Sequence, residues 1–246
     1  MALRRLGRGG GCQALRLVSL GVKELDEALG GGIPHPSLIS IEGEHGSGKT
    51  AFAQQIVHSM LREGMRVCVV TGEATVKEYL EMMRSVRLDA SDSFISGRLT
   101  IYPLHVKGGQ WNGFLSSLFL RVVWGFLELK RRRFDCVAID SLSAISMDTP
   151  RHEFLTFLTR IKNIVSDGKT VIVTFHPRSL PEENVMRLKA SSDVYLTLRN
   201  ARFAGMPVKV LEIVKLWGAG GRKSSVMLEI HPTMGLRVMP LGGVRL

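Results

Sequence analysis

The stretch that decides the fold is Gly43-Glu-His-Gly-Ser-Gly-Lys-Thr50, which fits the pattern G-x-x-x-x-G-K-[ST]. Glycines let the backbone amides of such a loop curve around phosphate groups, while Lys49 reaches the outer phosphates and the Thr50 hydroxyl can ligate Mg²⁺. An apolar run precedes the loop, and apolar residues recur behind it at helical spacing. We therefore expect a nucleoside triphosphate and Mg²⁺ to bind here. The predicted nucleotide-binding residues are Gly43, Glu44, His45, Gly46, Ser47, Gly48, Lys49, Thr50 and Ala51.

Two acidic residues complete the predicted site. Asp140 ends the apolar run Phe134-Asp-Cys-Val-Ala-Ile-Asp140, and a carboxylate in that position can hold the metal and its water shell together with Thr50. Glu73 follows the next strand-like run, where strand ends converge on a ligand. It is the candidate catalytic base that orients an attacking water. An ordinary acid at the start of a helix, before Thr75, explains Glu73 equally well.

Thr174 and His176 end a later strand-like run beside the predicted site. They could sense the γ-phosphate of a bound nucleotide. A plain strand-to-loop turn before Pro177 is the alternative interpretation.

Strand-like and helix-like runs alternate from Leu38 to about Leu198. Such alternation predicts an α/β fold, with a mainly parallel sheet and helices on both of its faces. After Val194 the pattern changes to strand-like runs separated by Gly- or Pro-containing turns, which predicts an antiparallel extension of the same sheet. These runs are Val194–Leu198, Val208–Val214, Val226–Ile230 and Leu236–Met239. We expect residues 1–16 to form a flexible basic arm and residues 17–246 to form one domain.

Composition and charge say less about the class of protein than the phosphate loop does. Lys and Arg (33) exceed Asp and Glu (22) and give the 246-residue chain a formal charge of +11. Such a surface attracts anions, including nucleotides, nucleic acid, anionic lipid headgroups and acidic proteins. Neither a transmembrane run nor a secretory signal is visible. Three widely spaced cysteines suit a reducing cytoplasm, and the seven histidines show no metal-ligand spacing.

Two further features allow alternative interpretations. A long helix is expected over Trp111–Lys130, and its wide apolar face, with Phe114 and Leu118, is more typical of core than of a partner surface. Arg121 within that face is the one hint of an interface. The basic run Lys130-Arg-Arg-Arg133 is typical of a solvated helix end, where cations are favoured by the helix dipole. Binding of lipid or nucleic acid is its alternative role.

Several stretches resemble known families. Leu25-Asp-Glu-Ala-Leu-Gly-Gly-Gly-Ile-Pro34 and Asp140-Ser-Leu-Ser143 resemble KaiC-like members of the RecA superfamily. Three others are similar to the archaellum accessory family FlaH (ArlH). These are Thr71-Gly-Glu-Ala-Thr-Val-Lys-Glu-Tyr-Leu80, Val173-Thr-Phe-His-Pro177 and His231-Pro-Thr-Met-Gly-Leu-Arg-Val-Met-Pro240.

The resemblance implies a RecA-like P-loop NTPase domain in which one strand separates the phosphate-loop strand from the Asp140 strand. It implies a ring of subunits, expected to be a hexamer, with nucleotide near the subunit interfaces. It also implies a cytoplasmic, peripheral place at the base of the archaeal motility filament. There the partners are the motor ATPase and the membrane platform protein.

The chain also departs from the pattern of active relatives. KaiC-like proteins carry two adjacent glutamates where this chain has Glu73-Ala74, and active relatives offer a Lys-x-Arg finger where it has Lys215-Leu-Trp217. A missing trans-acting arginine can remove several orders of magnitude in rate. Lys215 could still contact a neighbour's phosphates, although a strand-end surface lysine is the simpler interpretation.

These departures favour an ATP-binding assembly or regulatory component with weak or no hydrolysis. An active KaiC-like ATPase or autokinase is the first alternative. A RecA-like DNA-binding ATPase is the second, and nucleic acid is the less expected partner. The sequence shows neither a helical DNA-binding module nor the aromatic platforms that single strands prefer.

Overall fold

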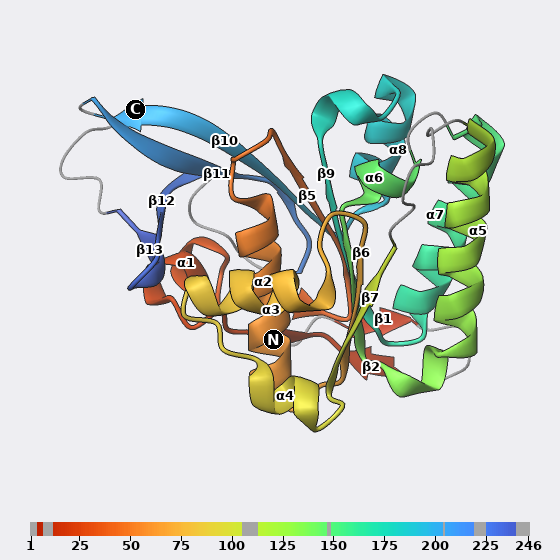
Figure 1. Ribbon diagram of the computed structural model, residues 1–246, viewed down its shortest axis with the longest axis horizontal. Helices are drawn as coiled ribbons and strands as arrows, with labels where there is room; N and C mark the ends of the chain where they lie inside the picture. The colour runs from red at the N-terminus through yellow and green to blue at the C-terminus, as the bar shows by residue number, and fades with distance from the viewer. Residues whose placement is uncertain are drawn as a thin grey trace.

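The computed structural model of the protein describes residues 4–6, 12–104, 113–146, 149–203, 205–218 and 225–239. A nine-stranded sheet with the order β13-β12-β11-β10-β5-β9-β8-β6-β7 forms the centre of the fold (Figure 1). Its strands are β5 (Leu38–Gly43), β6 (Val67–Thr71), β7 (Leu99–Pro103), β8 (Cys136–Asp140), β9 (Thr170–Phe175), β10 (Val194–Phe203), β11 (Met206–Leu216), β12 (Ser225–His231) and β13 (Gly235–Val238).

The strands from β10 to β7 along this order run parallel, and β11, β12 and β13 continue the sheet in antiparallel pairs. This confirms the expected mainly parallel sheet with an antiparallel extension. Strand β9 lies between β5 and β8, so the phosphate-loop strand and the Asp140 strand are separated by one strand, as the resemblance implied. Parallel strands place their carboxyl ends at one edge of the sheet, which the site occupies.

Helices cover both faces of the parallel strands (Figure 1). One face is covered by α2 and α3, and the other by α5 and α7. The helices are α1 (Lys23–Ala28), α2 (Lys49–Arg62), α3 (Val76–Ser85), α4 (Ser91–Ile95), α5 (Gly113–Leu129), α6 (Leu142–Ser146), α7 (Arg151–Ser166) and α8 (Glu182–Ser191), with 3₁₀ turns η1 (Arg131–Arg133) and η2 (Pro177–Ser179).

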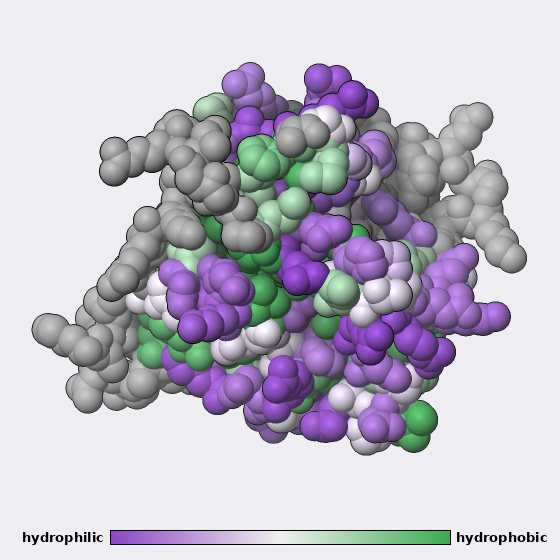
Figure 2. Space-filling model, turned by 90° about the vertical axis from the view of Figure 1, so that its left-hand side faces the viewer, coloured by the Kyte–Doolittle hydropathy of each residue, from purple (hydrophilic) through white to green (hydrophobic). Residues whose placement is uncertain are grey.

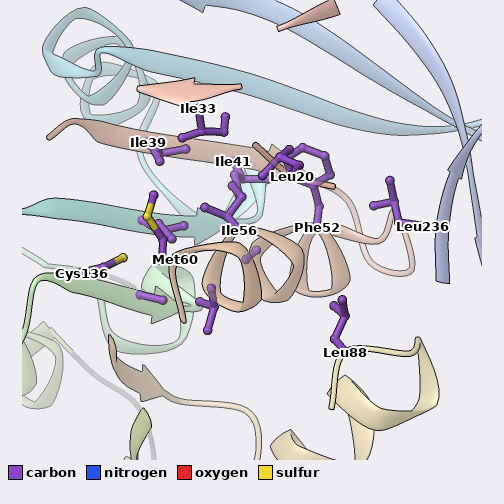
Figure 3. Packing of buried hydrophobic residues seen from close by; sticks show 14 of the residues in the cluster. Leu20, Ile33, Ile39, Ile41, Phe52, Ile56, Met60, Leu88, Cys136 and Leu236 are labelled. Carbon is purple, nitrogen blue, oxygen red and sulfur yellow. The ribbon is translucent and has the colours of Figure 1, made fainter. Parts of the chain in front are cut away.

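The larger core forms around α2, the helix that follows the phosphate loop (Figure 3). Phe52, Ile56 and Met60 recur on one side of α2, are fully buried, and pack with Ile39 and Ile41 of β5. Burying each such side chain stabilises the fold by about 1.5–3 kcal/mol. Truncation of Phe52 to alanine would cost about 3–5 kcal/mol, because a cavity would remain. This core therefore fixes α2 against the strand that carries the loop.

A second core lies on the opposite face of the sheet. Phe154, Phe157 and Ile161 of α7 pack there with Val171 and Val173 of β9. Because the central strands are covered on both sides, they read as continuous apolar runs rather than as alternating patterns.

Helix α5 differs from the expectation for its apolar face. Phe114 is 77% exposed and Leu118 45% exposed, so the core prediction is wrong for these two residues. Helix α5 instead buries Leu120, Val123 and Leu127, which pack into the second core. Phe119 and Phe126 are partly buried against that core, and Trp111 lies outside the described residues.

The amino-terminal segment contains two short strand pairs. β1 (Arg4–Leu6) pairs with β2 (Cys12–Ala14), and β3 (Arg16–Val18) pairs with β4 (Ile33–His35), both antiparallel. The predicted boundary between residues 16 and 17 falls inside β3, while the flexibility of residues 1–16 stays a prediction.

Figure 2 shows the side of the molecule where the antiparallel extension and α3 lie, and hydrophilic residues cover much of it between smaller hydrophobic areas. Within the described ranges, no helix combines the length and the apolar character needed to cross a membrane.

Candidate nucleotide-binding site

The phosphate loop leaves the end of β5 in a conformation that two of its glycines make possible. Gly48, just before α2, has φ +91°, and a Cβ there would collide with the Ile230 side chain of β12. A Cβ at Gly43 would lie 3.0 Å from the Leu198 carbonyl oxygen and would collide with the Ser47 hydroxyl. Gly43 therefore requires glycine for space beside the backbone of β10, and Gly48 requires it for its backbone conformation.

Lys49 begins α2 and is only 7% exposed. The hydrogen bond of its ammonium group is long, 3.4 Å to the Glu44 carbonyl oxygen. Nearby, the buried Ser47 hydroxyl has no hydrogen-bond partner among the described residues. A buried cation with one weak partner, at the N-terminus of a fourteen-residue helix, matches the needs of a phosphate group.

Asp140 ends β8 beside this lysine and is 3% exposed. Its Oδ1 atom accepts hydrogen bonds from the Thr174 hydroxyl at 2.5 Å and from the Thr50 hydroxyl at 3.3 Å. Burial raises the pKa of Asp140, and the charge of Glu73 adds to the rise, against the two hydroxyl hydrogen bonds and the charge of Lys49. A carboxylate and a hydroxyl are hard oxygen donors, which suit Mg²⁺. Thr50 and Asp140 thus fit the predicted metal site.

Glu73 reaches the same place from β6. Thr71 pairs with Asp140 in the sheet, so Glu73 lies two residues beyond the strand end. Its Oε1 accepts a hydrogen bond of 2.7 Å from the Ser141 hydroxyl, and the side chain is exposed. Just after it, a capping box between Thr75 and Glu78 starts α3. The carboxylate is therefore held close to the metal residues from a solvent-facing position.

A cavity of about 580 Å³ opens beside Glu73. Its lining includes Thr50, Asp140 and the α3 residues Glu78 and Glu81. Water and the outer phosphates of a nucleotide therefore have room next to the candidate base.

His176 lies against the loop from the other side of Asp140. Its ring centroid is 4.7 Å from that of His45, and its backbone N–H donates a hydrogen bond of 2.7 Å to the Ser143 hydroxyl. Burial lowers the pKa of His176, and the neighbouring His45 and Lys49 side chains lower it further, while Glu44 opposes them. The ring is therefore neutral at neutral pH.

Strands β10 and β11 contact the phosphate loop through two residues that sequence reasoning missed, Asn200 and Lys209. The Lys209 ammonium donates hydrogen bonds to the Gly46 carbonyl oxygen and, at 2.5 Å, to Oδ1 of Asn200. The Asn200 amide donates to the His45 carbonyl oxygen at 3.4 Å. The two residues are direct partners across β10 and β11.

These contacts orient the loop. In a trans peptide, the carbonyl and the following N–H point in opposite directions. Fixing the carbonyls of His45 and Gly46 outward therefore fixes the orientation of the next two amides. Such contacts carry no sequence motif, and only the register Asn200↔Lys209 brings them together.

Lys215 is not brought to the phosphate loop of its own chain. Its ammonium donates hydrogen bonds to the carbonyl oxygens of Ala190 at 2.8 Å and Lys189 at 3.4 Å, at the end of α8. Cations are favoured at such helix ends. The other predicted residues, from Gly43 to Ala51 with Glu73, Asp140, Thr174 and His176, converge at the carboxyl edge of the sheet.

Comparisons with known proteins agree with this geometry. A family model described as the ATPase KaiC matches residues 18–243. The archaeal flagellar ATP-binding protein FlaH of Sulfolobus acidocaldarius is 36% identical, with 92% of this chain and 97% of that protein covered. FlaH of Methanocaldococcus jannaschii is 27% identical, with 93% and 97% covered.

A crystal structure of the flagellar accessory protein FlaH from M. jannaschii matches with a TM-score of 0.81 at 25% identity, and covers 92% of this chain and 99% of that one. Its similarity and the match to the family model extend over nearly the whole of the domain described above. The chain therefore belongs to the KaiC-type ATPase family and, within it, to the archaeal flagellar ATP-binding FlaH proteins.

Proposed function

We propose that this protein is an ATP-binding regulatory and assembly component of the archaellum motor, with weak or no hydrolysis of its own. The main support for ATP binding is that two charged residues beside Thr50 are buried. Lys49 and Asp140 are each less than a tenth exposed. Burial of charged groups with few partners costs free energy unless a ligand completes them.

The residues would divide the work of binding. Backbone amides of the loop and the start of α2 would hold the phosphates, and Lys49 would neutralise their charge. Thr50 and Asp140 would hold Mg²⁺, which when bound polarises the phosphoryl oxygens. Thr174 keeps Asp140 oriented through its hydrogen bond of 2.5 Å. The His176 ring, which lies tilted against that of His45, would sense whether the outer phosphate is present.

The proposal of weak ATP hydrolysis is supported by the surroundings of Glu73. Its carboxylate is engaged by a hydrogen bond from the Ser141 hydroxyl, which holds it in place beside Asp140. The next residue is Ala74, so a second acid is missing at the adjoining position. Lys215-Leu-Trp217 offers no arginine for a neighbour's phosphates, and Lys215 is engaged at the end of α8.

The wider role follows from the family. FlaH relatives carry the description archaeal flagellar ATP-binding protein. We therefore propose a ring, expected to be a hexamer, that engages the motor ATPase and the membrane platform protein from the cytoplasmic side. Lys215 would contact a neighbour's nucleotide in that ring only after leaving the carbonyl oxygens at the end of α8.

An active ATPase or autokinase is favoured by one observation. Glu73 borders the 580 Å³ cavity together with Thr50 and Asp140, which is where a catalytic base would meet a water or a hydroxyl.

The deciding experiment measures the nucleotide retained by the purified protein and its turnover with and without the motor ATPase. We expect bound ATP to be retained, and turnover to stay well below about one per second in both cases. Turnover of tens per second by the protein alone would overturn the proposal. Glu73→Gln, with the cavity residue Glu81→Gln as the matched control, then tests the base. Equal effects of the two substitutions would remove Glu73 from that role.

A further inference from the structure

The amino-terminal edge of the sheet, opposite the phosphate loop, is lined by cations. Arg98 directly precedes β7, Arg66 precedes β6, the turn Arg131–Arg133 precedes β8, and Lys169 precedes β9. Backbone hydrogen bonds bring these positions side by side, from Val67 N to Arg98 O at 2.7 Å and from Asp135 N to Arg66 O at 2.8 Å. We call the six cations, Arg66, Arg98, Arg131, Arg132, Arg133 and Lys169, the basic edge.

Only part of this charge is neutralised. Arg66 pairs with Asp135, and Arg131 pairs with Glu128 and Asp167. Six cations against these three carboxylates leave a net charge of +3. Arg98, Arg132 and Arg133 are exposed and form no ion pair within the described ranges.

Two protruding aliphatic side chains flank the basic edge. Ile95, at the end of α4, is 82% exposed, and Leu129, at the end of α5, is 86% exposed. Each lies three residues before an exposed arginine, Arg98 and Arg132 respectively. Figure 1 shows α4 and the end of α5 at the same lower margin of the molecule, away from the phosphate loop. Isolated exposure of aliphatic groups in water is unfavourable, and an apolar environment would relieve it.

We propose that the basic edge docks on the surface of an anionic lipid bilayer. The cations would lie at the headgroups, and Ile95 and Leu129 would insert at the boundary of the acyl chains, as in other interfacial anchors. Single-stranded nucleic acid would instead call for exposed aromatic rings. Phe114 and Trp217 are the large exposed aromatic side chains among the described residues, and neither belongs to this edge. Because the nucleotide site faces the other way, docking leaves it open.

The test is co-sedimentation of the full chain with vesicles of phosphatidylcholine, with and without 30% phosphatidylglycerol. We expect binding to the anionic vesicles only, and loss of binding at high salt. Each cation near such a surface contributes about fivefold. The triple substitution Arg98→Gln, Arg132→Gln and Arg133→Gln should therefore weaken binding about a hundredfold.

A matched control carries the same loss of charge elsewhere. Lys23→Gln, Lys77→Gln and Arg202→Gln change three exposed cations outside the basic edge, and we expect them to retain most of the binding. Ile95→Ser with Leu129→Ser should reduce binding to the anionic vesicles by about tenfold without changing its salt dependence.

Equal losses in the triple substitution and its control would contradict the proposal, because net charge alone would then explain binding. Absence of binding to the anionic vesicles would also overturn it, and salt-dependent binding of a labelled oligonucleotide through the same arginines would then assign the basic edge to nucleic acid.

Discussion

The two edges of the central sheet carry charge in opposite ways. At the carboxyl edge, Lys49 and Asp140 are buried and poorly compensated by their protein partners. At the amino edge, Arg66 and Arg98 are exposed, and Arg66 and Arg131 are paired with acids. Buried charge costs stability, whereas exposed charge costs little and exposed pairs contribute about 0–1 kcal/mol. The comparison indicates that buried charges destabilise the carboxyl edge of the ligand-free protein, and that a bound nucleotide can compensate this cost.

The largest expected effect is at Lys49. Lys49→Ala should weaken ATP binding about a hundredfold, because a charge-assisted contact to phosphate is lost. The rise in melting temperature with ATP, measured by differential scanning fluorimetry, should disappear with it. Lys23→Ala is the control. A normal ATP-dependent shift in Lys49→Ala would mean that the carboxyl edge is not the nucleotide site.

The substitution Asp140→Asn should weaken ATP binding and at the same time stabilise the ligand-free protein. We expect ATP affinity to fall about thirtyfold and to lose its dependence on Mg²⁺. Without ligand, the free energy of unfolding at neutral pH should rise by about 1 kcal/mol.

The expected rise in the free energy of unfolding follows from the pKa of Asp140. Burial raises this pKa in the folded state, so folding favours the protonated form. Stability is therefore lost as pH rises through that pKa, and the asparagine variant should lack this slope. Urea titrations at several pH values measure it. A less stable Asp140→Asn protein at neutral pH would contradict the conclusion that buried charge destabilises the carboxyl edge.

Lys209→Met tests whether the antiparallel extension supports the carboxyl edge. We expect ATP affinity to fall about fivefold, with unchanged dependence on Mg²⁺, because the Gly46 peptide loses its fixed orientation. Stopped-flow measurements with a fluorescent ATP analogue should show the loss. Lys209→Arg should recover most of it, and an equal loss in both variants would argue for a general structural defect.

The smallest effect is expected at the amino edge, from His35. Burial lowers the pKa of His35 to about 4, and the charges of Arg16 and Lys169 contribute, while Asp135 opposes them. The unfolded chain then binds more protons than the folded chain, so stability is full above about pH 6.5 and falls as pH decreases toward 4.

Between pH 7 and 5 this contributes about 0.5–1 kcal/mol, after allowance for solvent screening of the partly exposed ring. The difference in unfolding free energy between wild type and His35→Gln, followed across this range, measures it. A difference that does not change with pH would remove His35 as the source.

The sequence was sufficient for the parallel half of the fold and for the phosphate loop. Continuous apolar runs and the Gly43–Thr50 motif are local signals, and they predicted the strand ends on which Asp140 and Thr174 lie. Ser141, Asn200 and Lys209 were missed, because their roles depend on contacts between residues far apart in the chain.

The outer face of α5 was misread for a related reason. A helix with apolar residues on most of its circumference does not reveal which of them the sheet will cover. The structure buries Leu120, Val123 and Leu127 and leaves Phe114 exposed. Short elements such as α4 and the β3–β4 pair have too few residues for a periodic signal.

The place of β5 within the sheet has a consequence for hydrogen exchange. This strand has a ladder on each side, with β9 and with β10. Each of its amides donates into one of these ladders, and opening either ladder disrupts the centre of the sheet, which approaches global unfolding. Residues 44–48 of the loop leave that ladder at Gly43 and can open locally. Bound nucleotide should therefore slow exchange in the loop by orders of magnitude, while the adjoining strand changes only as far as the whole protein is stabilised.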